Sequence, residues 1–373
     1  MTNLQQSLDV AGGRPTGFDY LRIGLACAVV IVHSVGLSYG GDYADPFFQK
    51  PGAHAISMLI LPMFFSLSGF LVTGSLDRCK TLFGFLGLRF IRIYPALAVE
   101  VLLSAFVLGP IFTTVAWRDY FTDPTFFRYL INVTGHISFY LPGVFLENPS
   151  PGMVNRQLWT VPFELYCYFA LTILAFTRLA RKAAFLLLAV VVFQLGLVAR
   201  LAVFRPSSLL ADEFPGHVAG PQLVIAFLAG VLVYRFRERL PSGRMPILVA
   251  GSLSIVLFSF PAGGFLGVFT AAYATICLGV LNPKKVGILR GADYSYGVYL
   301  YGWPIQQALV ATGGWARHAI VNATASLIIA FAIAALSWHL IEKPALDLRG
   351  PLRRLEELWI RLWRRSPAAA SRV

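Results

Sequence analysis

An arginine and a histidine eleven residues apart are the residues whose types and spacing first suggest chemistry. Arg22 and His33 lie in the first long apolar segment. Eleven residues at about 100° each return to nearly the same helix face, roughly 16 Å further along the axis. Burial disfavours the charged imidazolium, so His33 suits a general base supported by Arg22. A topology anchor at Arg22 and a packing role for His33 explain the same pattern.

A carboxylate in the fourth apolar segment is a second reactive group. Glu164 lies about five residues inside the predicted outer end of its helix, roughly 8 Å deep, where an unpaired charge is costly. Counted from the other end, His33 reaches a similar depth, so we expect Glu164 to contact His33 and to fix its tautomer. The alternative is that Glu164 pairs with a tyrosine or an arginine and only braces the helices.

Basic residues at the start of the third apolar segment suit a ligand that carries phosphates. Arg89 and Arg92 are three residues apart and share a helix face, with Tyr94 just beyond them. Guanidinium groups bind phosphate bidentately, so we assign these three residues to the binding of a phosphate-bearing cofactor. Ordinary anchoring by basic residues at the inner membrane surface also explains the cluster as a whole.

Aromatic side chains with polar groups complete the predicted site. Trp159 precedes the helix of Glu164, and Tyr296 and Tyr299 belong to a tyrosine-rich run before Trp303. We assign Trp159, Tyr296 and Tyr299 to substrate binding, although an aromatic belt at the membrane surface explains them nearly as well. The four cysteines lack the spacing of a metal site, so we expect no metal.

The elements that must position these residues are membrane helices. Of the 373 residues, 57% are hydrophobic and only 13% are charged, whereas soluble domains carry about 25% charged residues. An all-α integral membrane protein with ten transmembrane helices is therefore predicted, because ten apolar stretches are long enough to span the bilayer. They cover roughly residues 20–40, 56–76, 93–114, 160–177, 183–204, 220–235, 246–260, 264–282, 295–313 and 318–341.

Loop charges predict that both termini lie inside. With that orientation, 24 of the 31 lysines and arginines fall in inner segments, and their alternation follows every span. The net charge of +13 is therefore read as a membrane signature, and no nucleic acid is expected as a partner. We divide the chain into a cytoplasmic segment 1–16, a membrane domain 17–346 with a long external loop 115–159, and a basic tail 347–373. Apolar residues at helical spacing predict that this tail is an amphipathic helix along the inner interface.

Six motifs, in this order, resemble the acyltransferase 3 family over about residues 17–346. They are Asp19–Arg22 with the Arg22-x10-His33 spacing, Phe65–Phe70, Arg89–Pro95, Leu158–Glu164, Ser295–Leu300 and Ile341–Pro344. The resemblance implies a bacterial inner-membrane enzyme with about ten helices. It would transfer an acyl group, most often acetyl from acetyl-CoA, to a sugar hydroxyl of a cell-envelope or extracellular polysaccharide or of its lipid-linked precursor.

The resemblance also implies roles for individual residues. His33 is the catalytic residue with Arg22 in support, and Arg89 and Arg92 bind the phosphates of the acyl-CoA donor. Implied partners are the lipid bilayer, a glycan acceptor and polysaccharide-assembly proteins. One departure is Gly302, where many members have histidine. Outside the resemblance, a polytopic transporter or a lipid or glycan flippase is the alternative function, and a non-catalytic scaffold is a third.

Overall fold

A computed structural model describes residues 2–177, 179, 182–204, 218–287 and 291–365, and within them the chain forms helices and no named strand. Six helical segments are long and apolar enough to cross a membrane. Their principal helices are α2 (Gly17–Tyr39), α4 (Pro51–Arg78), α5 (Leu82–Leu103), α9 (Val161–Phe176), α10 (Ala183–Phe204) and α16 (Ala319–Ser337).

The other four predicted spans correspond to shorter apolar helices. They are α12 (Gly220–Arg235), α13 (Arg244–Phe258), α14 (Gly264–Gly279) and α15 (Ser295–Ala311), each of 15 to 17 residues. Every predicted apolar stretch therefore contains a helix in the structure, which confirms the all-helical class. Ten membrane crossings and the inward position of both termini remain predictions.

Helices α4 and α12 approach each other closely because each has a glycine against the backbone of the other. A Cβ atom on Gly69 would lie 2.0 Å from the carbonyl oxygen of Phe227, and one on Gly230 would lie 2.0 Å from that of Ser66. Small residues allow such backbone contact between membrane helices, where packing drives association. The contact holds α4 at the centre of the bundle, where it carries residues that line the site.

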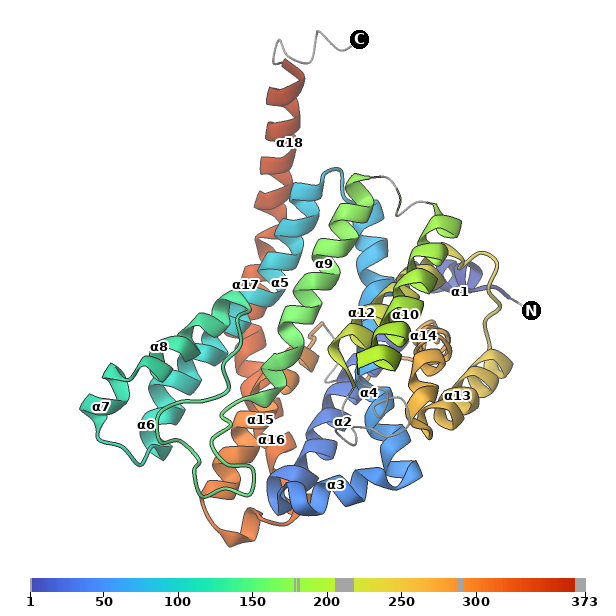
Figure 1. Cartoon of the computed structure of the whole chain (residues 1–373). Coiled ribbons are helices and arrows are strands. Elements are labelled where there is room, and N and C mark those ends of the chain that lie inside the picture. The colour runs from blue at the N-terminus through green and yellow to red at the C-terminus, as the bar shows by residue number, and fades with distance from the viewer. Residues whose placement is uncertain (1, 178, 180–181, 205–217, 288–290, 366–373) are drawn as a thin grey trace.

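The long connection predicted over 115–159 contains short helices. After α5, the chain continues through η1 (Ser104–Leu108) and α6 (Gly109–Phe112), then forms α7 (Trp117–Thr122) and α8 (Pro124–Leu130). In Figure 1 these elements form an arm at one side of the bundle. The chain then returns to α15, where Gln307 Nε2 donates to the carbonyl oxygens of Ser150 and Met153.

Both ends of the described chain are helical. The predicted segment 1–16 contains α1 (Leu4–Val10), whose buried Leu4 and Leu8 pack in one cluster with Phe70. At the other end, α16 continues through η8 (Trp338–Glu342) and α17 (Lys343–Asp347) into α18 (Arg349–Arg365). Figure 1 shows α18 rising beside the start of α5 and projecting beyond the other helices. The helix itself is confirmed, and its course along the inner membrane surface remains a prediction.

A pair of glycines on α5 explains why α18 lies beside that helix. A Cβ atom on Gly84 would lie 2.6 Å from a carboxylate oxygen of Glu356, and one on Gly87 would lie 2.7 Å from a methyl carbon of Leu352. In addition, the Thr81 hydroxyl donates to Glu356 at 2.6 Å, and Lys80 pairs with Glu357 at 3.0 Å. These contacts dock the first turns of α18 onto α5.

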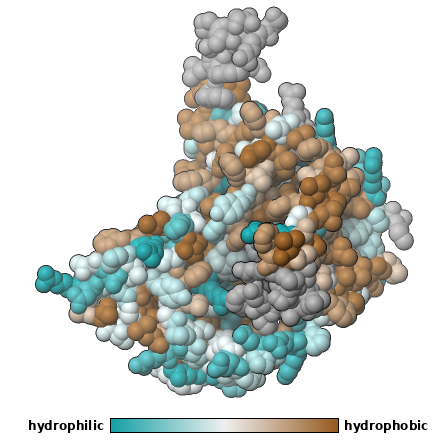
Figure 2. Space-filling model, viewed as in Figure 1, coloured by the Kyte–Doolittle hydropathy of each residue, from teal (hydrophilic) through white to brown (hydrophobic). Residues whose placement is uncertain are grey.

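The surface agrees with a membrane protein. Figure 2 shows apolar residues over the upper and right parts of the visible face, and hydrophilic residues along the lower edge near α3 (Gly41–Gln49) and at the far left near α7. Exposed leucine, valine and phenylalanine side chains on α10 belong to the apolar region. An apolar band of this kind is what lipid tails contact.

Candidate active site

Two cavities follow one another along the same three helices. The first cavity is lined by Arg22 of α2, by residues within 61–72 of α4 and by residues within 295–299 of α15. The second is lined by residues within 29–36 of α2, 57–61 of α4 and 299–303 of α15. The cavities therefore face opposite ends of the bundle, and their linings share Leu61 and Tyr299. By the loop-charge prediction, we call the first the inner cavity and the second the outer cavity.

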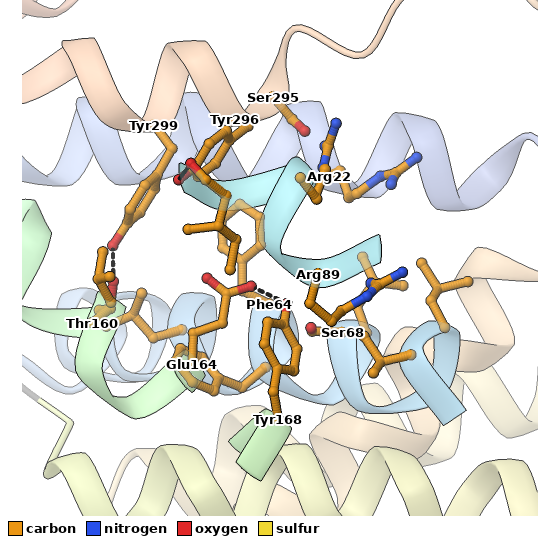
Figure 3. Close-up of a pocket in the computed structure, with 18 residues that line it drawn as sticks. Arg22, Phe64, Ser68, Arg89, Thr160, Glu164, Tyr168, Ser295, Tyr296 and Tyr299 are labelled. Atoms are coloured by element: carbon orange, nitrogen blue, oxygen red, sulfur yellow. Dashed lines mark hydrogen bonds between the residues drawn. The ribbon is translucent and has the colours of Figure 1, made fainter. Parts of the chain in front are cut away.

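The inner cavity has a volume of about 180 Å³ and is cationic at one end. Figure 3 shows Arg22 and Arg89 at that end, and Thr160, Glu164 and Tyr299 at the other. Its walls between these ends are mainly apolar and come from α4 and α5. A long ligand with an anionic head and a less polar arm would fit this distribution of groups.

Two of the three arginines that line the inner cavity are held by one aspartate. Asp293 accepts from Arg92 at 2.7 Å and pairs with Arg22 at 3.2 Å. Burial opposes the ionisation of Asp293, but Arg22 and Arg92 outweigh it and hold the pKa of the carboxyl well below its usual value. Arg22 also pairs with Asp19, and Arg92 lies 3.7 Å from Glu342. Arg22 and Arg92 are therefore neutralised largely by the protein itself.

Arg89 differs from these two arginines. It makes no ion pair with any carboxylate in the described part of the chain, and its polar contact is a 3.3 Å hydrogen bond to the Ser75 hydroxyl. The guanidinium lies over the rings of Phe85 and Tyr168. Its Nε, like that of Arg22, is buried without a hydrogen-bond acceptor among the described residues. Arg89 is therefore the arginine of this cavity best able to accept an external anion.

The outer cavity has a volume of about 130 Å³ and contains His33 in its lining. The imidazole packs edge-on against Trp303 at 4.9 Å between ring centroids. Trp159, Arg156 and Tyr299 are also in the lining. An imidazole beside aromatic faces and polar groups is an arrangement that can receive a sugar and remove a proton from its hydroxyl.

Gln157 fixes the tautomer of His33. Its Oε1 accepts at 3.0 Å from the backbone N–H of Trp303, which can only donate. Its Nε2 is therefore the atom 3.4 Å from His33 Nδ1, and an amide nitrogen can only donate. Nδ1 accepts this bond in the neutral ring, so the ring proton is on Nε2 and the one basic electron pair, on Nδ1, is engaged by Gln157.

The predicted contact between His33 and Glu164 is wrong. Glu164 lines the inner cavity and accepts a short hydrogen bond from the Tyr168 hydroxyl one helical turn away (Figure 3). His33 lines the other cavity, beside Gln157 and Trp303. Depth alone suggested the contact, but α9 turns Glu164 toward the cavity that α4 and α5 line, where Arg92 and Arg89 act on it electrostatically. The alternative, a tyrosine partner, is the one observed.

Tyr299 stands between the cavities. Its hydroxyl lies 2.7 Å from that of Thr160 and donates to the carbonyl oxygen of Gln157 at 3.1 Å. These bonds connect α15 to the turn η3 (Arg156–Thr160) that carries Gln157. A movement of the Tyr299 ring would therefore change both the separation of the cavities and the position of Gln157, which contacts His33.

A buried polar group anchors the segment before η3. The Asn155 amide donates to Glu100 Oε1 at 2.8 Å and to the carbonyl oxygen of Leu300 at 3.0 Å. Glu100 is fully buried and also accepts from Ser104 at 2.8 Å. This intramembrane carboxyl, for which the sequence offered no partner, thus ties α5 and α15 to the segment that positions Gln157.

Comparison with known proteins decides the family. The profile of Acyl_transf_3, described as an acyltransferase domain, matches residues 16–340. The chain belongs to the acyltransferase 3 family. It is similar to an O-acetyl transferase of Shigella phage Sf6, with 26% identity over 342 residues that cover 90% of this chain and 97% of the relative. It is also similar to Nodulation protein 10 of Rhizobium leguminosarum bv. viciae, with 29% identity over 370 residues that cover 92% and 96%. No solved structure matches.

Membership of the acyltransferase 3 family confirms the resemblance and supports a membrane O-acyltransferase over the transporter and scaffold alternatives. In this family member, the predicted residues separate into two groups. The inner cavity contains Arg22, Arg89, Arg92, Glu164 and Tyr296, the outer cavity contains His33 and Trp159, and Tyr299 lines both. Tyr94 lines neither of these two cavities and stacks on Phe90 at 4.5 Å.

Sequence reasoning missed three residues of this acyltransferase 3 site. Gln157 and Trp303 contact His33, and Asp293 joins Arg22 to Arg92. Weak signals were present, because Gln157 lies two residues before Trp159 and Asp293 two residues before Ser295. Neither signal indicates a partner, since each contact joins segments more than 120 residues apart in the chain.

Proposed function

We propose that this protein transfers an acyl group, most often acetyl, from cytoplasmic acyl-CoA to a hydroxyl of a cell-envelope or extracellular polysaccharide or of its lipid-linked precursor, at the bacterial inner membrane. The observation that carries the proposal is the pair of cavities that meet at Leu61 and Tyr299, one bearing arginines and the other His33. The O-acetyl transferase relative supports the reaction class.

In this proposal the inner cavity receives the donor. Arg89 binds a phosphate, because it is the cavity arginine without a carboxylate partner among the described residues. The apolar walls accept the pantetheine arm, and Glu164 accepts an N–H from one of its amides. The thioester then lies near Thr160 and Tyr299, at the end of the inner cavity that borders the outer one.

The outer cavity receives the acceptor sugar. Trp159 offers an apolar ring face in the lining, which suits the C–H face of a sugar. Arg156 supplies hydrogen-bond donors in the same lining, and His33 lies beside the shared residue Tyr299. A hydroxyl that reaches Nδ1 of His33 therefore comes close to the boundary with the donor cavity.

The reaction follows from these positions. The acceptor hydroxyl takes the place of Gln157 Nε2 as the donor to His33 Nδ1. The single lone pair of Nδ1 then receives the hydroxyl proton while the hydroxyl oxygen forms a bond to the thioester carbon, and the carbon–sulfur bond breaks. The CoA thiolate leaves and receives the proton from the imidazolium, so the ring returns to its neutral state. A positioned general base contributes on the order of 10²–10⁴-fold in rate. The apolar walls exclude water and thereby limit hydrolysis of the donor.

The test is the His33→Ala variant, assayed in cells by mass spectrometry of surface glycans and in vitro by release of CoA from acetyl-CoA. We expect normal insertion and abundance, retained CoA binding and loss of glycan acylation by on the order of 10²-fold or more. A matched control is His54→Ala, because His54 is a buried histidine that lines neither cavity. Normal acylation in His33→Ala would remove His33 from the mechanism.

A further inference from the structure

A group of arginines at the inner end of the bundle is not used by the function described so far. Arg349 on α18 lies within electrostatic range of Arg14, Arg89, Arg92 and Arg353. Arg14, Arg349 and Arg353 are exposed and come from three separate places in the chain: the segment before α2 and two successive turns of α18. We call these three residues the outer arginine cluster because they lie outside the lining of the inner cavity. The cluster is distinct from the outer cavity, which is at the opposite end of the bundle.

The cluster has no ion-pair partner in the described ranges. Arg22 and Arg92 have Asp19, Asp293 and Glu342 as partners, whereas no carboxylate there forms an ion pair with a member of the outer arginine cluster. Like charges without a directly paired acid repel one another, and such an arrangement is stabilised when an anion binds. Several guanidinium groups at adjustable distance are the chemistry that binds a phosphate dianion.

The position of the cluster is fixed by the docking of α18. Glu356 and Leu352 fill the space above Gly84 and Gly87, and Thr81 donates to Glu356. Arg353 lies between these two docked residues in the sequence. It is close to Arg89, because both arginines interact electrostatically with Cys79. The α5 helix that carries Arg89 into the inner cavity therefore also holds α18 beside the mouth of that cavity.

We propose that α18 forms part of the donor site and that Arg349 and Arg353, with Arg14, bind the 3′-phosphate of the CoA nucleotide. This inference rests on the proposed function, because it concerns the same acyl-CoA donor. Arg89 at the cavity binds the diphosphate, and the nucleotide beyond it extends toward the outer arginine cluster. The helix at the C-terminal end is thus a specificity element that distinguishes CoA from donors without a 3′-phosphate.

The decisive comparison uses CoA and dephospho-CoA, which differ only in the 3′-phosphate. Affinities are measured by calorimetry on the full-length protein in nanodiscs of phosphatidylcholine, a lipid without net charge. We expect the wild-type protein to bind CoA about tenfold or more tightly than dephospho-CoA, since a charge-assisted hydrogen bond contributes roughly 1.5–3 kcal/mol. The double variant Arg349→Gln, Arg353→Gln should bind both ligands with the affinity that the wild type has for dephospho-CoA.

A matched control removes the same charge from the same predicted side of the membrane. Arg239, after α12, and Arg244, the first residue of α13, are exposed and absent from the inner cavity lining. Arg239→Gln with Arg244→Gln should therefore leave the preference for CoA intact. An unchanged melting temperature in both double variants shows that the fold is kept. Retained preference in Arg349→Gln, Arg353→Gln overturns the inference.

The remaining outcomes separate this inference from the proposed function and from lipid binding. A wild-type protein that binds neither CoA nor dephospho-CoA overturns the proposed donor and the inference together. Equal wild-type affinities for the two ligands overturn the role of the 3′-phosphate alone. Nanodiscs with anionic phosphatidylglycerol test the other source of phosphate. If the double variant loses only its association with anionic lipid and keeps its preference for CoA, the cluster is a lipid site and the inference is wrong.

Discussion

At the scale of single residues, partners were harder to predict than reactive groups. His33, Arg89 and Glu164 could be selected from the sequence because ionisable side chains are rare and costly inside apolar helices. Their partners could not, because Gln157 and Asp293 are common residue types in loops and turns, where nothing in the local pattern sets them apart. The Glu164–His33 contact failed for the same reason, since depth in a helix says nothing about which way the helix is turned.

Gln157 provides the sharpest test at this scale. The Gln157→Glu variant keeps an acceptor for the Trp303 amide but presents a second acceptor, in place of a donor, to His33 Nδ1. A proton on Nδ1 is then favoured, and the basic electron pair is lost from that atom. We expect kcat to fall by about 10²-fold with an unchanged KM for acyl-CoA, because Gln157 is absent from the inner cavity lining. A wild-type kcat in this variant would contradict the assigned tautomer.

At the scale of elements, hydropathy located the helices well and their mutual arrangement poorly. Helices α10 and α12 begin and end where the apolar stretches 183–204 and 220–235 do. Helix α18 was predicted as amphipathic, but its docking on α5 depends on Gly84 and Gly87, whose role appears only when the two helices are side by side. Periodicity reports which face of a helix is apolar, whereas the identity of the partner depends on long-range packing.

The crossing of α4 and α12 allows a stability prediction. The Gly69→Leu variant places side-chain atoms where the Phe227 carbonyl lies only 2.0 Å from the ideal Cβ position. Backbone cannot yield as a flexible side chain can, so we expect a loss of at least roughly 1–3 kcal/mol and a lower melting temperature in detergent. The control is Gly251→Leu on α13, where no atom lies within 4 Å of the added Cβ. Equal melting temperatures for the two variants would show that the helices can separate without cost.

At the scale of the whole molecule, the two cavities give a direction to the proposed reaction. On α2 and α15 the inner cavity is lined by earlier residues than the outer cavity, and on α4 it is lined by later residues. Which end meets the cytosol rests on loop charges, because the arrangement of helices is the same in either orientation. Loop charges thus predict the orientation, and the structure gives the order of the two cavities along the bundle axis.

Cysteine labelling tests this orientation. In a variant whose four native cysteines are replaced by alanine, Thr122→Cys on α7 and Glu238→Cys in the α12–α13 connection introduce exposed thiols at predicted outer and inner positions. We expect a membrane-impermeant maleimide to label Thr122→Cys in intact spheroplasts and Glu238→Cys only after permeabilisation. The reverse pattern would place His33 nearest the cytosol and would exchange the donor and acceptor sides.

The hydroxyl contact between Tyr299 and Thr160 has a consequence for the energy supply of the cell. Water-filled spaces that approach each other from the two faces of a coupling membrane threaten to dissipate its proton gradient. Here the closest point is occupied by a phenol ring whose hydroxyl is engaged with Thr160 and with the Gln157 carbonyl. In the proposed reaction, passage of an acetyl group would require only a brief shift of that ring, whereas a continuous file of water would require it to stay away. The ring would then act as an insulator against ion leakage through the protein.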